Sequence, residues 1–297
     1  MYVKTQKAGK GMNINKWLAK NTESLSGKRI AITGSTGGIG KELCRYLLKL
    51  DASLVLINRN QNRSDDLVKL LKSEFAHADI IQIIADMEDI NSVKSICESL
   101  ESMEIYAIIL NAGAYSIPRH KCTAGYENVF QINFVSPYYM AIRLRDHVEK
   151  IVAVGSIAHN YSHVKKDDID LSKVNKASLV YGNAKRYLTY ALLGAFEDSP
   201  KKLSIAHPGI TFTGITNHYP KLIFAIIKHP MKIIFMKPRF ACLSILLGIF
   251  EHTEKSSWIG PSLFDIWGKP KKKLLKTATE EEQKFICKTA ERIYGEL

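Results

Sequence analysis

The chain has 297 residues, of which 46% are hydrophobic and 24% charged, together with 18 glycines and nine prolines. This composition is that of a globular protein and excludes collagen-like, low-complexity and wholly disordered chains. The formal net charge of +13 favours anionic ligands in general, including phosphorylated cofactors, anionic lipids and nucleic acid. No helix-turn-helix, zinc-finger or RNA-binding aromatic motif accompanies the charge, so we expect no nucleic-acid partner.

The cysteines and the apolar segments indicate the compartment. Five cysteines, an odd number without CxxC spacing, argue against a zinc knuckle or a secreted disulfide framework and favour a reducing compartment. The histidines show no metal-ligand spacing, so we expect no metal site. The N-terminal residues lack the apolar run of a signal peptide, and the longest uncharged apolar run, 240–250, is about half as long as a membrane span. We therefore expect a cytoplasmic protein, with peripheral contact at a membrane left open.

Short apolar runs alternate with longer segments of helical period from Arg29 almost to residue 210, which predicts a parallel sheet with helices on both faces. The predicted strands, in chain order, are 29–33, 53–57, 80–85, 105–110, 151–154 and 203–206. The predicted helices between them are 39–50, 63–76, 91–100, 126–148 and 180–196. A last strand-like segment, 257–264, is separated from a terminal helix near 280–294 by the basic run 269–273. We expect one α/β domain over residues 26–297, a Rossmann-type doubly wound parallel sheet with helices on both faces, preceded by a basic lead-in over residues 1–25.

The first predicted strand runs into Thr33-Gly34-Ser35-Thr36-Gly37-Gly38-Ile39-Gly40, a glycine-rich turn followed by a helical pattern. Glycines at such a turn allow a tight bend and the close approach of a pyrophosphate, and the helix N-terminus supplies free N–H donors and the positive end of its dipole. The turn therefore predicts a dinucleotide site. The other interpretation is a glycine-rich turn without a ligand.

The second predicted strand runs into Asn58-Arg59-Asn60 and has no acidic side chain there. Chains that bind NAD usually place an acid at this point, about 20 residues after the glycines, to bind the ribose 2′-hydroxyl. The guanidinium of Arg59 suits a 2′-phosphate instead. We therefore predict NADP, with NAD the less favoured cofactor, and the alternative is that Arg59 is a solvated surface residue.

Tyr181 and Lys185 are four residues apart, which puts a phenol and an ammonium on one face of a helix. Such a pair arises easily by chance and gains meaning from Ser156, after the fifth strand, and Asn111, after the fourth. The carboxyl ends of parallel strands meet at one edge of a doubly wound sheet, where catalytic side chains are exposed. The sequence therefore predicts an active site at this edge. His159 and His163, just beyond Ser156, could line the substrate mouth, but we expect both to be solvated loop residues.

Together these residues resemble the short-chain dehydrogenase/reductase family over residues 27–295, and within it the branch of the retinol dehydrogenases and the WW-domain oxidoreductase. The TGxxxGIG turn is complete, and the further matches follow in chain order: Asp86, Asn111-Ala112-Gly113, Asn133, Ser156, Tyr181, Lys185 and Pro208-Gly209-Ile210-Thr211-Phe212-Thr213. Leu110 stands where the family usually has Asn, and Gly155 where a second Ser is frequent.

The resemblance implies an oxidoreductase that interconverts an alcohol and a ketone or aldehyde, with Ser156, Tyr181, Lys185 and Asn133 as catalytic residues. It implies cofactor contacts from Thr33, Gly34, Ser35, Thr36, Gly38, Ile39, Gly40, Asn58, Arg59, Asp86, Asn111, Ala112, Gly113, Tyr181, Lys185, Pro208, Gly209, Thr211 and Thr213. It also favours a homodimer that pairs the segments 126–148 and 180–196. The alternatives are a non-catalytic NADP-binding sensor on the same fold and a sugar-nucleotide epimerase or dehydratase, whose relatives usually differ in glycine spacing and have a longer C-terminal domain.

The proposed chemistry fits the residue types. A carbonyl that accepts a hydride needs a proton donor at its oxygen, and a Tyr with a pKa of about 10 is a poor donor at neutral pH. We expect Lys185, together with the charge of oxidised nicotinamide, to lower that pKa, and Ser156 to donate a hydrogen bond to the substrate oxygen. By resemblance, Lys185 also holds the nicotinamide ribose and Asn133 anchors a water in the proton path.

No acidic residue occurs between Asp198 and Glu251. In this stretch Lys221, Lys228 and Lys232 fall on one helical stripe with a wide apolar face opposite, in the region of about 214–240 where the family places a lid over its substrate. An apolar lid predicts a hydrophobic substrate such as a retinoid, a steroid or a fatty acyl derivative. The apolar face could pack on the core or on a partner subunit, or it could lie in a membrane interface, or the segment could be a disordered lid.

Overall fold

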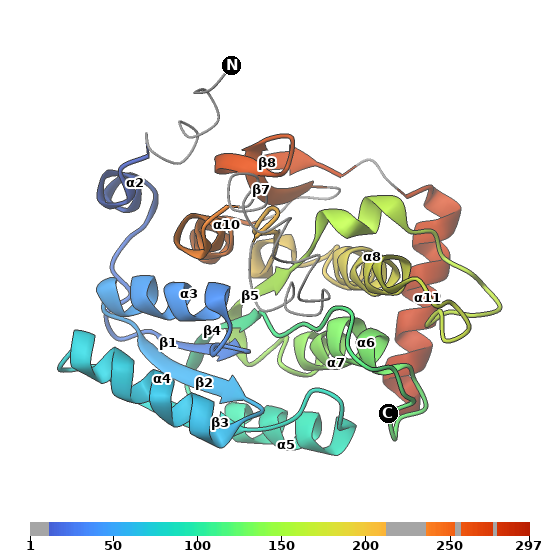
Figure 1. Cartoon of the computed structure of the whole chain (residues 1–297), viewed down its shortest axis with the longest axis horizontal. Coiled ribbons are helices and arrows are strands. Elements are labelled where there is room, and N and C mark those ends of the chain that lie inside the picture. Colours follow the sequence, from blue (N-terminus) through green and yellow to red (C-terminus); the bar gives the residue numbers. More distant parts are fainter. Residues whose placement is uncertain (1–11, 212–235, 253–256, 276–277) are drawn as a thin grey trace, which may run out of the picture.

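The structure, a computed structural model of the chain, describes residues 12–211, 236–252, 257–275 and 278–297. These residues form an eight-stranded sheet in the order β3-β2-β1-β4-β5-β6-β7-β8, with helices on both faces (Figure 1). The first seven strands are parallel, and β8 pairs antiparallel with β7. The strand order reverses between β1 and β4, which creates the crevice where doubly wound sheets bind their ligands. The predicted fold class is confirmed.

Seven strands fall at or within a few residues of their predicted positions, because strands buried on both faces are nearly continuous apolar runs. Their bounds are β1 (Arg29–Thr33), β2 (Ser53–Asn58), β3 (Ile80–Ile84), β4 (Ile105–Leu110), β5 (Val148–Val154), β6 (Leu203–Ala206) and β7 (Ser257–Leu263). The eighth strand, β8 (Trp267–Leu274), was not predicted and contains the basic run interpreted as a separator. Lysines and a proline are typical of an edge strand, which has one neighbour and discourages further pairing.

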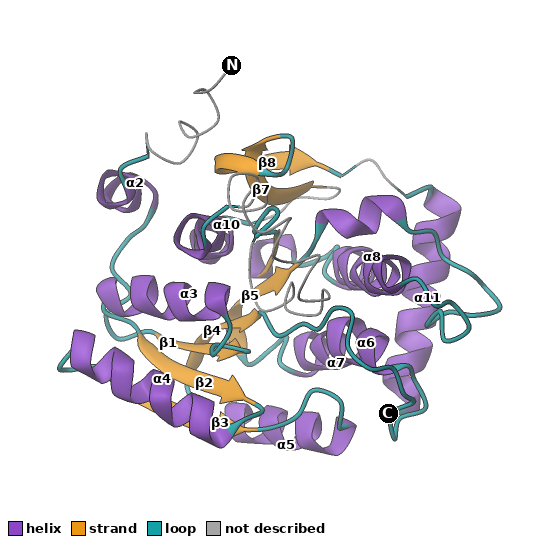
Figure 2. Cartoon of the chain, in the orientation of Figure 1, coloured by secondary structure: helices purple, strands orange, loops and turns teal. Residues whose placement is uncertain are grey.

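Two helical layers cover the sheet, as Figure 2 shows in purple on either side of the orange strands. One layer contains α2 (Ile14–Asn21), α3 (Gly38–Lys49), α4 (Gln61–Glu74) and α10 (Pro238–Phe250). The other contains α5 (Ile90–Glu101), α6 (Asn128–Phe130), the π-helical turn η1 (Gln131–Val135), α7 (Ser136–Arg143), α8 (Ala177–Ala195) and α11 (Glu280–Glu296). Two 3₁₀ turns, η2 (Ile157–Tyr161) and η3 (Pro200–Lys202), precede α8 and β6.

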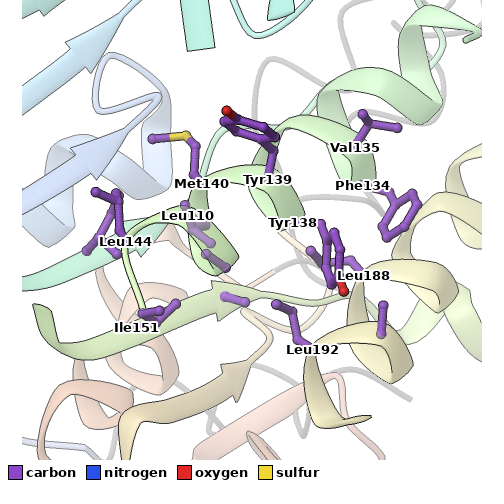
Figure 3. Packing of buried hydrophobic residues seen from close by; sticks show 14 of the residues in the cluster. Leu110, Phe134, Val135, Tyr138, Tyr139, Met140, Leu144, Ile151, Leu188 and Leu192 are labelled. Carbon is purple, nitrogen blue, oxygen red and sulfur yellow. The ribbon is translucent and has the colours of Figure 1, made fainter. Parts of the chain in front are cut away.

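The core between α7, α8 and the sheet fixes the helix that bears Tyr181 and Lys185. Figure 3 shows Tyr138 of α7 facing Leu188 of α8. Deeper in the same cluster, the rings of Phe130, Phe134 and Tyr187 have centroids 5.0 to 5.2 Å apart. Aromatic contacts of this kind each add roughly 0.5–1.5 kcal/mol to the burial of apolar surface. The helix that bears Tyr181 and Lys185 is therefore held in place by a densely packed layer.

Three segments differ from the sequence-based prediction. The helix expected over 126–148 is interrupted by η1 and ends at Arg143, so that β5 starts at Val148. The basic lead-in expected over 1–25 contains α2, whose Trp17 and Leu18 are buried in the core. The lid expected over about 214–240 lies mostly outside the described residues, and its last part is the start of α10, which packs in the core.

Candidate active site

The glycine-rich turn starts at Thr33, the last residue of β1, and ends in the first turn of α3. Gly34 has a left-handed φ of 68°, and a Cβ on it would stand 2.9 Å from the Cα of Ala112. A Cβ on Gly40 would stand 2.7 Å from the carbonyl oxygen of Gly34. Glycine is therefore required at both positions. The N-cap residue Gly37 provides no side-chain cap, which leaves N–H groups in the first turn of α3, where Gly38 and Ile39 lie, for an anionic ligand.

Asn58, the last residue of β2, lies behind this turn and is buried. Its Oδ1 accepts hydrogen bonds from Ser35 Oγ at 3.0 Å and from the Thr36 N–H at 3.2 Å, and its Nδ2 donates to Ser64 Oγ of α4 at 3.0 Å. The amide group of Asn58 is therefore bonded to the turn and to α4. Asn58, which we predicted as a cofactor contact, therefore shapes the turn from behind, and so does the buried Ser35.

The end of β4 is fastened to the same turn. Thr33 Oγ1 accepts hydrogen bonds from the N–H groups of Asn111 at 3.0 Å and Ala112 at 2.9 Å. The Asn111 side chain donates to the carbonyl oxygens of Thr33 at 3.0 Å and Gly34 at 3.1 Å. Because β1 and β4 are neighbours at the point where the strand order reverses, these bonds define the floor of the crevice.

Arg59 lies just beyond β2, 66% exposed, with two carboxylates beside it. Its Nη1 is 3.3 Å from Glu88 Oε1 and 3.9 Å from Asp86 Oδ2. Asp86 Oδ1 in turn accepts the Glu88 N–H at 3.0 Å. Arg59 and Asp86, both predicted to contact the adenosine half of a dinucleotide, thus lie together at the ends of β2 and β3. A phosphate that binds Arg59 must compete with Glu88.

Within the described ranges, Glu88, His120 and Cys122 place possible ligand atoms within 4.8 Å of one another, a grouping the sequence spacing did not predict. Two of these residues, His120 and Glu88, already have hydrogen-bond partners within the protein. Asn128 Nδ2 donates to Pro118 O at 3.0 Å and faces His120 Nδ1 at 3.1 Å. His120 Nδ1 is therefore the acceptor, and Nε2 carries the proton that points to Glu88 Oε2 at 2.9 Å.

Asn133 lies in η1, and π-helical turns are frequent at functional sites. Its Nδ2 donates to the carbonyl oxygens of Ala114 and Val129, both at 2.8 Å. Its Oδ1 is buried without a hydrogen-bond partner among the described residues. A Cβ on Gly113 would stand 2.8 Å from this Oδ1 and 3.9 Å from Lys185 Nζ. The structure thus brings Asn133 Oδ1 and Lys185 Nζ to the same point beside Gly113, with an acceptor left free for a water.

Ser156 follows β5, and Tyr181 lies in the second turn of α8. The Ser156 hydroxyl lies close enough to the Tyr181 phenol to lower its pKa as a hydrogen-bonding neighbour, and Ser156 Oγ accepts the Ala158 N–H at 3.2 Å. Gly182 makes this meeting possible, because a Cβ there would stand 2.5 Å from the carbonyl oxygen of Ala158 in η2. The two predicted catalytic residues therefore meet, and they do so through a glycine that sequence reasoning did not single out.

Lys185 is buried one turn further along α8. Its Nζ donates to the carbonyl oxygen of Val154 at 2.8 Å and lies 5.9 Å from the centre of the Tyr181 ring. Burial lowers the pKa of Lys185 from 10.5 to about 7. Burial also raises the pKa of Tyr181, and the hydrogen bond with Ser156 opposes this rise only in part. The expected lowering of the Tyr181 pKa by Lys185 together with the charge of oxidised nicotinamide stays a prediction.

The Pro208–Gly209 turn follows β6 and lies beside Ser156, because Val154 of β5 pairs with Ala206 of β6. Gly209 has a φ of 76°, and a Cβ on it would stand 2.6 Å from the carbonyl oxygen of Ile266. Thr211 forms a bridge with Met236. Thr213, also predicted to contact the cofactor, lies outside the described residues.

Sequence reasoning missed several side chains that border the site. The ring of Tyr115 packs edge-on against Tyr181 with the centroids 5.4 Å apart. His159, expected to be solvated, is fully buried, and that expectation is wrong because its ring turns inward and packs on Trp258. No spacing in the sequence indicates these contacts, since each joins segments far apart in the chain.

A nicotinamide dinucleotide fits this arrangement. The glycines leave a cradle that a Cβ would fill, α3 has no side-chain cap at its N-terminus, and Asn133 Oδ1 is a buried acceptor without a partner among the described residues. Arg59 offers a guanidinium to the sugar-phosphate end. Ser156 and Tyr181 stand at the other end, at the carboxyl edge of β5.

Comparisons with known proteins agree with this geometry. A family model described as short chain dehydrogenase matches residues 28–166. An uncharacterized oxidoreductase of Schizosaccharomyces pombe is 27% identical, over 76% of this chain and 73% of that protein. Human polyprenol dehydrogenase is 25% identical, over 64% of this chain and 63% of its own length. Mouse retinol dehydrogenase 12 is 25% identical, over 65% of each chain. The chain thus spans just under two thirds of the length of the last two relatives.

Solved structures share the fold. The chain matches an uncharacterized protein from Mycobacterium paratuberculosis with a TM-score of 0.71 at 16% identity, over 93% of this chain and 97% of that one. It matches the NADPH-dependent 3-quinuclidinone reductase from Rhodotorula rubra with a TM-score of 0.59 at 18% identity, over 76% of this chain and 85% of that one. It also matches a short chain dehydrogenase/reductase from Burkholderia phymatum in complex with NAD, with a TM-score of 0.55 at 16% identity, over 76% of this chain and 87% of that one. None of the helices in the described ranges is long and apolar enough to cross a membrane.

Proposed function

We propose that the chain is a short-chain dehydrogenase/reductase, an NAD(P)-dependent oxidoreductase, and that it interconverts an alcohol and a ketone or aldehyde with NADP(H). The observation that carries the proposal is the close packing of η2 against α8, which brings Ser156 beside Tyr181 with Lys185 buried one helical turn away. A protein that only sensed NADP would need neither this pair nor a buried lysine. Burying a lysine beside two hydroxyl groups costs folding free energy, and a cluster of this kind is typical of catalytic sites.

In the direction of reduction, the nicotinamide supplies the hydride and the residues of this chain handle the substrate oxygen. The Ser156 hydroxyl donates a hydrogen bond to that oxygen and stabilises the charge that develops on it. The Tyr181 phenol donates the proton. Because burial raises the pKa of Tyr181, the phenol is protonated near neutral pH, and a nearby positive charge must lower that pKa for the phenol to be a ready proton donor.

Lys185 and Asn133 form the path by which Tyr181 regains its proton. A Lys185 ammonium stabilises the phenolate that remains after proton transfer, and its pKa of about 7 allows it to exchange protons near neutral pH. Asn133 Oδ1, beside Gly113 and near Lys185, is an acceptor that can hold a water. In oxidation the same groups work in reverse, with Tyr181 as the base.

NADP is the proposed cofactor because Arg59 lies at the end of β2 and no acid replaces it there. The competing carboxylates of Glu88 and Asp86 reduce the advantage of a 2′-phosphate, since each is paired with the guanidinium. A charge-assisted hydrogen bond from Arg to phosphate is stronger than an exposed ion pair. We therefore expect NADP(H) to bind more tightly than NAD(H).

A hydrophobic substrate is supported by the surroundings of Tyr181. Val129, Leu171 and Val180 form a small apolar cluster against which Tyr181, Ile117 and Leu179 pack. The relatives named polyprenol dehydrogenase and retinol dehydrogenase 12 carry the names of apolar alcohols. We propose an apolar alcohol or carbonyl compound as the substrate, and the lid residues 214–235 that would cover it lie outside the described residues.

The predicted dimer through the segments 126–148 and 180–196 meets an obstacle. α11 packs along α8 within the same chain: Glu282 pairs with the buried Arg186 at 2.6 Å, and Tyr294 contacts Tyr139 of α7 at a centroid distance of 5.3 Å. A dimer would need another face or would have to displace α11.

We propose a cytoplasmic location, which the free state of all five cysteines supports.

The proposal is tested by initial rates on a panel of apolar and small ketones and alcohols. Wild type is compared with Tyr181→Phe, and Tyr161→Phe serves as the matched control because Tyr161 is 73% exposed. We expect Tyr181→Phe to lower kcat by at least about a hundredfold, the usual contribution of a general acid, and Tyr161→Phe to behave as wild type. Equal turnover in wild type and Tyr181→Phe would remove Tyr181 as the acid.

A further inference from the structure

Behind the active site, the indole of Trp258 on β7 lies between two buried histidines. The ring of His207 stacks on it, with centroids 4.0 Å apart and an angle of 22°. The ring of His159 meets it edge-on at 4.9 Å. All three side chains are at most 2% exposed. Histidines are seldom fully buried without a role that requires their polar atoms.

His159 bonds to the wall of the site that carries Ser156. Its Nδ1 lies 2.6 Å from the carbonyl oxygen of Ser156, and a carbonyl only accepts, so Nδ1 carries the proton. Its Nε2 is buried with no partner among the described residues. The side chain thus makes one hydrogen bond, and that bond goes to the backbone of a catalytic residue.

His207 bonds to the opposite wall. Its Nδ1 accepts the N–H of Gly209 at 3.2 Å, so Nε2 carries the proton, which points to Asp265 Oδ1 at 3.1 Å. Lys273 Nζ donates to the same Asp265 oxygen at 2.8 Å. Gly260 of β7 leaves the space for this ring, because a Cβ there would overlap it. The tautomer of His207 is therefore fixed by Asp265, and Asp265 is held by Lys273.

The hairpin that presents Asp265 has an unfavourable backbone. Phe264 and Asp265, between β7 and β8, both have left-handed φ values, 52° and 57°. Asn, Asp and Gly tolerate this conformation, and a bulky Phe does not. Phe264 is also 84% exposed and gains little from packing. The turn therefore keeps a strained residue while it directs Asp265 inward.

We propose that Trp258 and the two histidines form a support that sets the spacing between Ser156 and the Pro208–Gly209 turn, with His159 and His207 as positioning residues. This inference rests on the proposed function and on the expected cofactor contact of Pro208 and Gly209, which we place at the nicotinamide half because the turn lies beside Ser156. His207 then governs how well that half is bound. His159 governs how well Ser156 is aligned for the chemical step.

Two substitutions separate the contacts of His207. His207→Gln ends in an amide near the position of Nε2, keeps a donor for Asp265 and loses the acceptor for Gly209. His207→Asn places its amide oxygen near the position of Nδ1 and keeps that acceptor. Dissociation constants are measured for NADPH and for adenosine 2′,5′-bisphosphate, which lacks the nicotinamide half. NADH and ADP replace these probes if NADH binds wild type more tightly.

We expect His207→Gln to weaken NADPH by about tenfold, the scale of one lost hydrogen bond to a buried N–H, and to leave adenosine 2′,5′-bisphosphate unchanged. His207→Asn should stay within about threefold of wild type for both probes. His77→Gln, an exposed histidine before β3, is the matched control and should change neither constant. Melting temperatures of all variants confirm that they fold.

His159→Phe tests the other wall. Phe keeps the ring on Trp258 and removes the bond to Ser156, and no other hydrogen bond of that side chain is lost because Nε2 has no partner among the described residues. We expect kcat to fall by about tenfold or more while the dissociation constant of NADPH stays that of wild type.

Three results would overturn the inference. One is a His207→Gln variant that binds NADPH as wild type does. Another is equal weakening of NADPH and adenosine 2′,5′-bisphosphate, which would indicate a purely structural role. The third is a His159→Phe variant with unchanged kcat. Failure of the proposed function looks different, because wild type itself would then bind neither dinucleotide or turn over no substrate.

Discussion

The carbonyl oxygen of Ala158 occupies the space that a side chain on Gly182 would need, since a Cβ there would stand 2.5 Å away. This close approach lets η2 lie against α8, and it is what brings Ser156 to Tyr181. The geometry of the candidate site therefore depends on the absence of a side chain next to Tyr181.

Gly182→Ala is expected to push η2 away from α8 and separate the two hydroxyls. Overpacking of this kind costs about 1–3 kcal/mol of unfolding free energy, and kcat should fall more than tenfold because the alignment is lost. Urea unfolding and initial rates measure the two effects. Gly295→Ala is the control, because a Cβ there meets nothing within 4 Å and alanine in a helix is favoured by about 0.5–1 kcal/mol. Wild-type kcat in Gly182→Ala would show that η2 adapts without loss.

Arg59→Asp is expected to weaken NADP(H) by about 1.5–3 kcal/mol, the scale of a charged hydrogen bond, and to change NAD(H) much less. Glu88→Gln should tighten NADP(H) a fewfold, because it removes a carboxylate that competes for the guanidinium. Dissociation constants for all four dinucleotides provide the measurement. Arg63→Asp, an exposed arginine on α4, controls for the change of net charge. If Arg59→Asp discriminates no better than Arg63→Asp, Arg59 is not part of the phosphate site.

Lys185→Met should alter the pH dependence of stability. Burial lowers the lysine pKa from 10.5 to about 7 in the folded chain, so below that pH the ammonium is charged in both states and its full burial cost opposes folding. Between the two pKa values the folded chain holds the neutral amine and the unfolded chain the charged one, so wild-type stability rises with pH by up to about 1.4 kcal/mol per unit relative to the variant. Urea unfolding without cofactor at about pH 7 and about pH 9.5 tests this sign. A difference between the two proteins that does not change with pH would contradict it.

Phe264→Asn should stabilise the fold. Asn tolerates the left-handed φ of 52°, and a side chain that is 84% exposed has little packing to lose, so we expect a gain of about 1 kcal/mol. Leu274→Asn is the control: it is 67% exposed in the extended strand β8, where Asn is disfavoured. Thermal unfolding compares the two. Loss of stability in Phe264→Asn would mean that the phenyl ring makes a contact the fold needs.

Most of the sheet could be predicted because its strands are buried on both faces and read as apolar runs. β8 could not, since an edge strand has little apolar surface to bury and its Lys271 and Pro270 resemble a loop. α2 was also missed. It is rich in lysine and asparagine, and only the packing of Trp17 and Leu18 against distant residues makes it part of the domain.

The site was predicted where chemistry dictates a residue type at a fixed spacing, as for Gly34, Tyr181 and Lys185. The residues that support them were not, because their roles arise from contacts between distant segments. His207 adjoins a recognised motif, yet its bond to Asp265 joins β6 to the hairpin after β7. The lowered pKa of Lys185 and its bond to Val154 could not be predicted from the sequence either, because both depend on how deeply the fold buries the side chain.

The central claim is that this chain transfers hydride between a nicotinamide and a carbonyl carbon with Tyr181 as the acid. The most direct measurement is a single turnover with NADPH deuterated at the transferable position of the nicotinamide, using a ketone from the panel and mass spectrometry of the product. Wild type should give an alcohol with one deuterium on the carbinol carbon, and Tyr181→Phe should form it at least about a hundredfold more slowly. Bound NADPH with no deuterium in any product would contradict the claim and would identify the chain as a dinucleotide-binding protein without this activity.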